Sequence, residues 1–168
     1  AFARFQYSPS GVSPRTITGM TKGNYLANSD EHDQFGLVDE SAENRQLMNQ
    51  RRLNKASSIL KMISLPIIEG DHDNLLISWG STKHIVATVA RQTKSAHLHF
   101  SIVYPLPTNL GTTLKKYKKI IVIENNLTHQ FSKLVTSQTG ILPTLNIGSD
   151  DGRPLDPKSI TKQIQDEL

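Results

Sequence analysis

The 168-residue chain contains no cysteine. This absence excludes disulfide bonds, zinc ribbons, thiol catalysis and an iron–sulfur cluster held by the chain itself, and it agrees with a cytoplasmic location. No apolar run approaches the roughly 18 residues that a membrane-spanning helix needs, so we predict no membrane association. Glycine-rich phosphate loops and the G-x-S-x-G elbow of hydrolases are also missing. The sequence therefore predicts no self-contained catalytic site.

Positive charge is only mildly in excess, with 19 Lys and Arg against 15 Asp and Glu. One dense spot comprises Lys115, Lys116, Lys118 and Lys119. Weak RNA binding there is one alternative, but no aromatic residues interleave with the lysines, and we predict no nucleic-acid partner. The chain starts at Ala1 without Met or a signal-peptide pattern, and we expect it to be the interior of a longer polypeptide.

The first forty residues are rich in turn formers. Two Ser-Pro steps and Gly11 fall within residues 8–15, so we predict irregular structure over residues 1–40. A helix is expected next, with Ser41 as N-cap and a run free of Gly and Pro over residues 42–63. Its arginine-rich middle indicates a solvated helix. Residues 41–71 are therefore interpreted as a linker helix followed by an edge strand.

Beyond residue 71 the pattern alternates between apolar strands and amphipathic helices. Strands are expected at 65–70, 74–80, 96–104, 119–124 and 142–147, and helices at 81–94, 108–117, 127–137 and from Asp156 and Pro157 onwards. Such alternation predicts a parallel sheet covered on both faces, a three-layer α/β/α domain at residues 72–168. We expect this domain to fold alone, and residues 1–40 to require a parent domain.

Two polar segments follow predicted strands, where ligands bind in open α/β sheets. Gly80, Ser81 and Thr82 follow the strand ending near Trp79, and Glu124, Asn125 and Asn126 end the most β-branched strand. Each segment could contact a ligand or an adjoining subunit. The alternative is that each merely caps the helix that follows it.

His97 and His99 alternate on one predicted strand and therefore point to one face. Two histidines in this spacing can bind a metal ion, but no third ligand has suitable spacing. Asp71, His72 and Asp73 are interpreted as a polar turn. We therefore predict cross-strand polar positions and no metal site.

Several motifs resemble, in order and spacing, the α subunit of 2-oxoacid:ferredoxin oxidoreductases. They are Gly11-Val12-Ser13-Pro14-Arg15, Asp30-Glu31-His32-Asp33 with Gly36, Glu43-Asn44-Arg45 with Met48, Leu76-Ile77-Ser78-Trp79-Gly80-Ser81-Thr82, Ala96-His97-Leu98-His99, Tyr104-Pro105-Leu106-Pro107 with Asn109-Leu110, and Glu124-Asn125-Asn126-Leu127. One departure is Gln50-Arg51-Arg52, which stands where the family usually has Lys-Arg.

The resemblance implies an enzyme that oxidatively decarboxylates a 2-oxoacid to an acyl-CoA and reduces ferredoxin. Thiamine diphosphate with Mg would carry the carbanion chemistry, and iron–sulfur clusters the electrons. The chain would be the C-terminal part of the α subunit. Residues 1–40 would be the tail of the thiamine-diphosphate-type domain, and residues 72–168 a transketolase C-terminal-like domain with a five-stranded, mainly parallel sheet.

The family's Tyr-Pro-Ile-Thr-Pro motif and most of its thiamine-binding domain are absent from this sequence. We therefore expect no cofactor bound by this chain alone, no catalytic residue within it and no activity of the piece by itself. The implied partners are the β subunit and, through the complex, ferredoxin and CoA. The rival hypothesis is a free-standing α/β module that binds a nucleotide or a partner at residues 80–82.

Arg15 is the remaining candidate. Gly11 and the prolines around it restrict the loop, which lowers the entropy cost of holding one guanidinium in place. A fixed guanidinium suits a carboxylate or a phosphate because it can bond two oxygens at once. Arg15 is thus a candidate contact to an acidic partner or to CoA; the alternative is a surface ion pair within its own domain.

Overall fold

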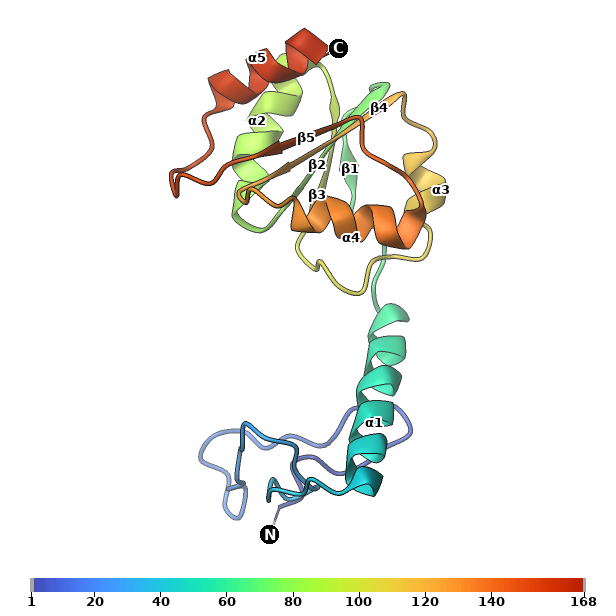
Figure 1. The fold of residues 1–168 in the computed structure, drawn as a ribbon, viewed down its shortest axis with the longest axis vertical. Coiled ribbons are helices and arrows are strands. Elements are labelled where there is room, and N and C mark those ends of the chain that lie inside the picture. The colour runs from blue at the N-terminus through green and yellow to red at the C-terminus, as the bar shows by residue number, and fades with distance from the viewer. Residues whose placement is uncertain (1, 168) are drawn as a thin grey trace. The chain divides into compact units, whose positions relative to one another are not determined.

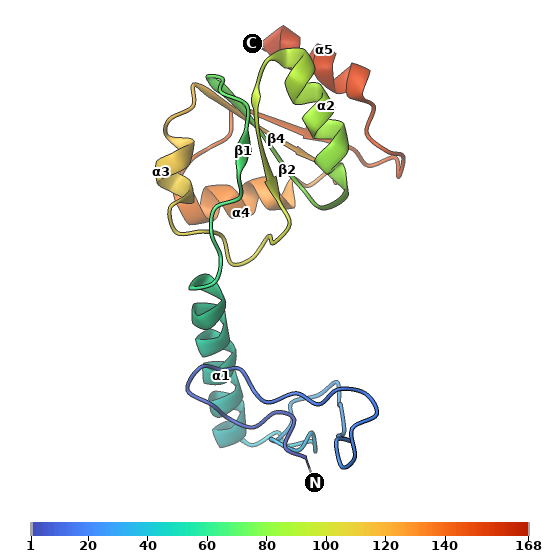
Figure 2. The same cartoon turned by 180° about the vertical axis from the view of Figure 1, so that it is seen from behind.

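The computed structural model describes residues 2–167 and divides the chain into two compact units, residues 1–62 and 63–168. The boundary lies inside the segment that the sequence assigned to a linker, so the long helix groups with the N-terminal residues and the edge strand with the sheet. Among residues 2–167, no helix combines the length and apolar character needed to cross a membrane. Figures 1 and 2 show the elements of each unit.

The first unit contains one helix, α1 (Ala42–Leu60). Its residues 2–41 form turns and extended loops, with a single β-bridge between His32 and Val38. The Ser41 hydroxyl accepts the Asn44 N–H at 3.3 Å, which confirms the predicted N-cap. Met48 is the only buried apolar residue described in this unit. The unit therefore depends on polar contacts rather than on a hydrophobic core.

The second unit alternates strands and helices as the sequence predicted. Its elements are β1 (Ile68–Glu69), β2 (Asn74–Trp79), a 3-10 turn (Gly80–Thr82), α2 (Lys83–Thr93), β3 (Ala96–Phe100), α3 (Leu110–Leu114), β4 (Lys119–Glu124), α4 (Gln130–Thr139), β5 (Leu145–Gly148) and α5 (Pro157–Glu167). The strand order is β1-β3-β2-β4-β5, with only β1 antiparallel to its neighbour.

Two apolar cores lie on opposite faces of this sheet. One includes Leu75, Leu98 and Val122 with residues of α3 and α4, and the other includes Leu76 and Ile121 with residues of α2 and α5. Figures 1 and 2 show the same division, with α2 and α5 on one side and α3 and α4 on the other. The predicted three-layer α/β/α class with a five-stranded, mainly parallel sheet is confirmed.

Several element ends differ from the sequence-based limits. The third and fifth strands are shorter than predicted, ending at Phe100 and starting at Leu145. Pro143, inside the predicted fifth strand, lacks the N–H that a ladder needs. The helix predicted from residue 127 starts at Gln130, after His129 in a left-handed conformation. The expected start of the last helix is confirmed, since the Asp156 carboxylate accepts two backbone N–H groups.

Candidate functional site

The two predicted contact segments of the sheet lie side by side. β2 and β4 are parallel neighbours, and Ser78 is paired with Ile123 near their carboxyl ends. The helix that follows β2 covers one face of the sheet and the helix that follows β4 covers the other. Connections that diverge in this way define a topological switch point, where open α/β sheets bind ligands. The structure therefore brings residues 80–82 and 124–126 together at that place.

Glu124 is the centre of the switch point and is fully buried. Its carboxylate accepts the Phe131 N–H at 3.0 Å and the Ser132 N–H at 3.1 Å, both in the first turn of α4. The Trp79 indole N–H and the Asn126 amide also donate to it, at 3.4 and 2.7 Å. A negative charge at a helix N-terminus is favourable because the free N–H groups there are donors without helical partners. Glu124 therefore anchors α4 and joins it to the end of β2.

The two asparagines after β4 differ in exposure, and Asn126 is half-buried. The Asn126 side chain donates to Glu124 and accepts the Gln130 N–H at 3.3 Å, so it takes part in capping α4, as one reading of the sequence predicted. Asn125 is exposed. Of the three polar residues 124–126, Asn125 is therefore the one that presents its side chain for a contact with another molecule.

The turn after β2 has one buried and two exposed residues. The Thr82 hydroxyl donates to the Trp79 carbonyl at 2.8 Å, which ties the turn back to its strand. Gly80 and Ser81 are exposed. The expectation that Ser81 opens the helix as a cap is wrong: residues 80–82 form a 3-10 turn, α2 starts at Lys83, and neither start has a side-chain cap. Gly80 and Ser81 thus form, with Asn125, the exposed rim of the switch point.

His97 and His99 form a polar network with a residue that the sequence did not single out. The Ser78 hydroxyl lies 2.7 Å from His97 Nε2 and 2.9 Å from His99 Nδ1. Ser78 stands opposite His99 on the neighbouring strand, so the predicted cross-strand polar arrangement is observed. His97 and Ser78 are buried and His99 is half-buried. The network lies inside the fold, which fits structure rather than substrate contact.

The pKa of His97 is lowered from 6.5 to about 4, chiefly by burial; Glu69 opposes this shift, and His99 and Lys83 contribute to it. The folded state thus favours neutral His97, whereas the unfolded chain binds a proton below about pH 6.5. We expect the α/β unit to be fully stabilised by this residue above pH 6.5, and to lose about 3 kcal/mol as the pH falls toward 4. Urea unfolding between pH 8 and pH 4, followed by Trp79 fluorescence, measures this loss.

Replacing His97 with Gln should remove the His97 part of this pH dependence; His99, whose pKa is also lowered by burial, remains in the network and leaves a smaller dependence. The matched control is His72→Gln, since His72 is exposed on a turn. An unfolding free energy that falls equally steeply in the His97 variant would contradict the assignment of the pH dependence to His97.

Two lysines of the lysine-rich spot have partners within the chain. Lys118 pairs with Asp73 at 2.5 Å, and the Lys119 ammonium donates to the Glu167 carbonyl. Lys115 and Lys116 are exposed. Two of the four lysines therefore hold neighbouring segments together, which weakens the RNA-binding alternative.

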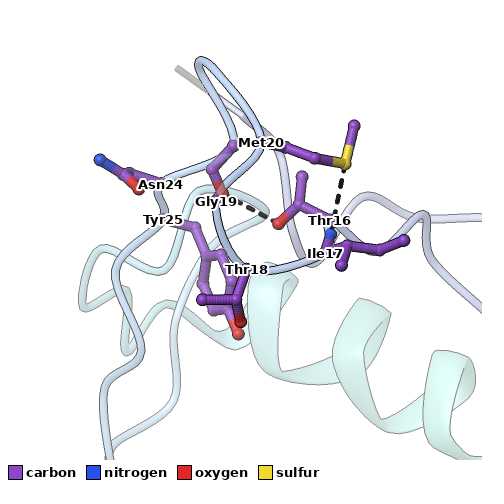
Figure 3. Close-up of a pocket in the computed structure, with 8 residues that line it drawn as sticks. Thr16, Ile17, Thr18, Gly19, Met20, Asn24 and Tyr25 are labelled. Atoms are coloured by element: carbon purple, nitrogen blue, oxygen red, sulfur yellow. Dashed lines mark hydrogen bonds between the residues drawn. The ribbon is translucent and has the colours of Figure 1, made fainter.

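Arg15 lies in the first unit and is exposed. Within residues 2–167, no carboxylate comes within 4.0 Å of its side-chain nitrogens, so the alternative of an ion pair is not observed among these residues. The residues that follow it line a pocket of about 310 Å³, formed by Thr16, Ile17, Thr18, Gly19, Met20, Gly23, Asn24 and Tyr25 (Figure 3). Two hydrogen bonds close the loop: the Thr16 hydroxyl donates to the Gly23 carbonyl, and the Ile17 N–H donates to the Met20 sulfur.

Ser13, two residues before Arg15, binds a side chain of α1, a contact that the sequence did not predict. Arg51 on α1 donates to the Ser13 hydroxyl from Nε at 3.1 Å and from Nη2 at 2.8 Å. Gly11 packs directly on the same helix, because a Cβ there would lie 2.3 Å from the Arg51 carbonyl oxygen. Ser13 and Arg51 stand 38 positions apart, and no signal in the sequence pointed to their contact.

The side chains described in residues 2–167 include no group of three or more His, Cys, Asp or Glu residues placed to hold a metal ion. With no cysteine in the chain, the thiolate ligands of an iron–sulfur cluster are not supplied by it.

No protein-family model matches the chain. The α subunit of 2-oxoacid:ferredoxin oxidoreductase from Saccharolobus solfataricus is 29% identical over 163 residues, covering 90% of this chain and 26% of the relative. The α subunit of 2-oxoacid:ferredoxin oxidoreductase 1 from Sulfurisphaera tokodaii is 32% identical over 162 residues, covering 92% of this chain and 26% of the relative.

A solved structure is similar over nearly the whole chain. It is a 2-oxoglutarate:ferredoxin oxidoreductase from Magnetococcus marinus with 2-oxoglutarate, coenzyme A and succinyl-CoA bound; the match covers 98% of this chain and 30% of that chain, with a TM-score of 0.73 and 25% identity. These findings confirm the resemblance carried by the sequence motifs. The chain spans about a quarter of the length of its curated relatives, and it is homologous to that part of the alpha subunits of 2-oxoacid:ferredoxin oxidoreductases.

Proposed function

We propose that the chain is the C-terminal part of the α subunit of a cytoplasmic 2-oxoacid:ferredoxin oxidoreductase. The observation that supports this most strongly is the continuous relationship with curated α subunits over about 90% of the chain. The complete enzyme would oxidatively decarboxylate a 2-oxoacid to an acyl-CoA and pass the electrons to ferredoxin. Thiamine diphosphate, Mg and the iron–sulfur clusters would be bound by the rest of the complex and supply the redox chemistry.

The proposed role of this piece is assembly and contact on the CoA side, not catalysis. The buried ionisable groups at the switch point and in the sheet, Glu124 and His97, are engaged by internal hydrogen bonds. The residues exposed for contact are Gly80, Ser81 and Asn125 at the switch point and Arg15 in the first unit. We infer that they face the β subunit or CoA, with Thr82, Glu124 and Asn126 shaping the surface from beneath.

The test is reconstitution. The purified 168-residue chain, mixed with a 2-oxoacid, CoA and ferredoxin, should give no acyl-CoA, because it has no cysteine to hold an iron–sulfur cluster. Co-expression with the remaining α-subunit polypeptide and the β subunit should give a complex that copurifies and turns over. Turnover by the chain alone, or full turnover by the complex without it, would refute the proposal.

The same complex tests Arg15. Arg15→Lys keeps the charge and removes the planar fork, so a two-oxygen contact should be weakened about tenfold. The measurements are KM for CoA and copurification with the β subunit. Arg45→Lys is the matched control, because Arg45 is also exposed in the first unit. If KM for CoA and assembly are both unchanged in the Arg15 variant, Arg15 is not a contact residue.

A further inference from the structure

Two guanidinium groups of the first unit meet over the Phe5 ring, and a lysine lies on the same helix face as one of them. The guanidinium carbon of Arg4 lies 5.6 Å from the ring centroid, and that of Arg51 lies 6.0 Å from it. Lys55 follows Arg51 by four residues on α1, so the two side chains lie on the same helix face. Segments far apart in the sequence thus place their positive charges together.

These cations have no acidic counterpart within the chain. Among residues 2–167, no carboxylate oxygen lies within 4.0 Å of a side-chain nitrogen of Arg4, Arg51 or Lys55. Two nearby acidic groups are engaged elsewhere: Glu31 pairs with Arg52 at 2.7 Å, and the Asp33 carboxylate accepts backbone N–H groups of its own loop. Arg51 donates only to an uncharged partner, the Ser13 hydroxyl.

The environment of Arg51 and Lys55 disfavours the charged form of each side chain. Burial lowers the pKa of Arg51, and the charges of Arg4 and Arg52 lower it further. Burial also lowers the pKa of Lys55, together with Arg51, Arg4 and Arg52. Arg51 is only 7% exposed. Repulsion among partly buried like charges is costly, and an oxyanion bound among them relieves it while gaining charge-assisted hydrogen bonds.

We propose that Arg4, Arg51 and Lys55 form a binding site for a phosphate group, either free or as the monoester end of a small ligand. A phosphate monoester carries about −1.5 to −2 charges at pH 7, which balances three cations better than the single charge of a carboxylate. Its several oxygens also suit two guanidinium groups and one ammonium. The inference rests on the first unit alone and does not depend on the proposed oxidoreductase function.

Inorganic phosphate titrated into the full 168-residue chain tests the site. The signals of the Arg4 and Arg51 Nε–H groups, followed by NMR at an ionic strength of about 20 mM where attraction is little screened, should shift and saturate. Sodium acetate at equal ionic strength should give much weaker binding. Binding by a glycerol monophosphate that is as tight as that of inorganic phosphate would identify a monoester end as an acceptable source; binding of inorganic phosphate alone would restrict the site to the free ion.

Charge-neutralising variants make the test specific. Arg4→Gln and Lys55→Gln should each weaken phosphate binding about tenfold, the loss of one charge-assisted contact. Arg45→Gln, an exposed position on the same helix, should leave it unchanged. Arg51→Gln also breaks the Ser13 contact, so the two other variants decide. Shifts that do not saturate, equal weakening by Arg45→Gln, or acetate binding as tightly as phosphate would each overturn the proposal.

Discussion

Replacing Glu124 with Gln should lower the free energy of unfolding of the α/β unit by about 2–4 kcal/mol. The carboxylate accepts four hydrogen bonds and is fully buried. Gln has nearly the same shape, but its NH₂ group would face a donor where an oxygen now accepts. The change also removes the negative charge from the N-terminus of α4, where the helix dipole favours it.

Urea unfolding measures this loss, with far-ultraviolet circular dichroism as the main probe because Trp79 touches Glu124 and its native fluorescence would change with the variant. The matched control is Glu167→Gln, which is exposed at the end of α5 and should change stability by less than about 0.5 kcal/mol. A Glu124 variant as stable as the control would show that the carboxylate is not the anchor of α4.

The layers of the α/β unit could be predicted from periodicity because strand and helix patterns depend on neighbouring residues. The strand order β1-β3-β2-β4-β5 depends on contacts between distant segments, and the alternation alone does not contain it. Glu124 shows the same limit. The sequence placed it correctly at the end of a strand, but its hydrogen bonds go to N–H groups seven and eight residues later, after a turn whose geometry no local pattern specifies.

His97 was partly predictable. The alternation with His99 fixed a common face, since side chains in a strand alternate. That Ser78 is their partner depends on the register between β2 and β3, because the register decides which side chain of β2 lies beside the two histidines. In the first unit, neither the cluster of Arg4, Arg51 and Lys55 nor the Ser13 contact could be read from the sequence, because loop packing follows no period.

The other large effect is expected at Gly11. A Cβ there would lie 2.3 Å from both the Arg51 carbonyl oxygen and the Lys55 backbone nitrogen, and these backbone atoms cannot move without distorting α1. We therefore expect Gly11→Ala to detach residues 8–15 from the helix. Detachment would break the Arg51 bonds to Ser13 and the bond from the Ser58 hydroxyl to the Ser10 carbonyl. Limited proteolysis should cleave this loop about tenfold faster or more, because cleavage follows the population of the open form.

Gly19→Ala separates the two causes that act at Gly11. Both glycines have a positive φ, +74° at Gly11 and +91° at Gly19, so an Ala costs about 1–3 kcal/mol of backbone strain at either position. Only Gly11 faces another backbone, since nothing lies within 4 Å of a Cβ at Gly19. Faster cleavage of residues 8–15 in the Gly11 variant, with Gly19→Ala unchanged in that loop, would assign the effect to contact with α1. Equal cleavage of that loop in the two variants would show that Gly11 is not needed for the loop to pack on the helix.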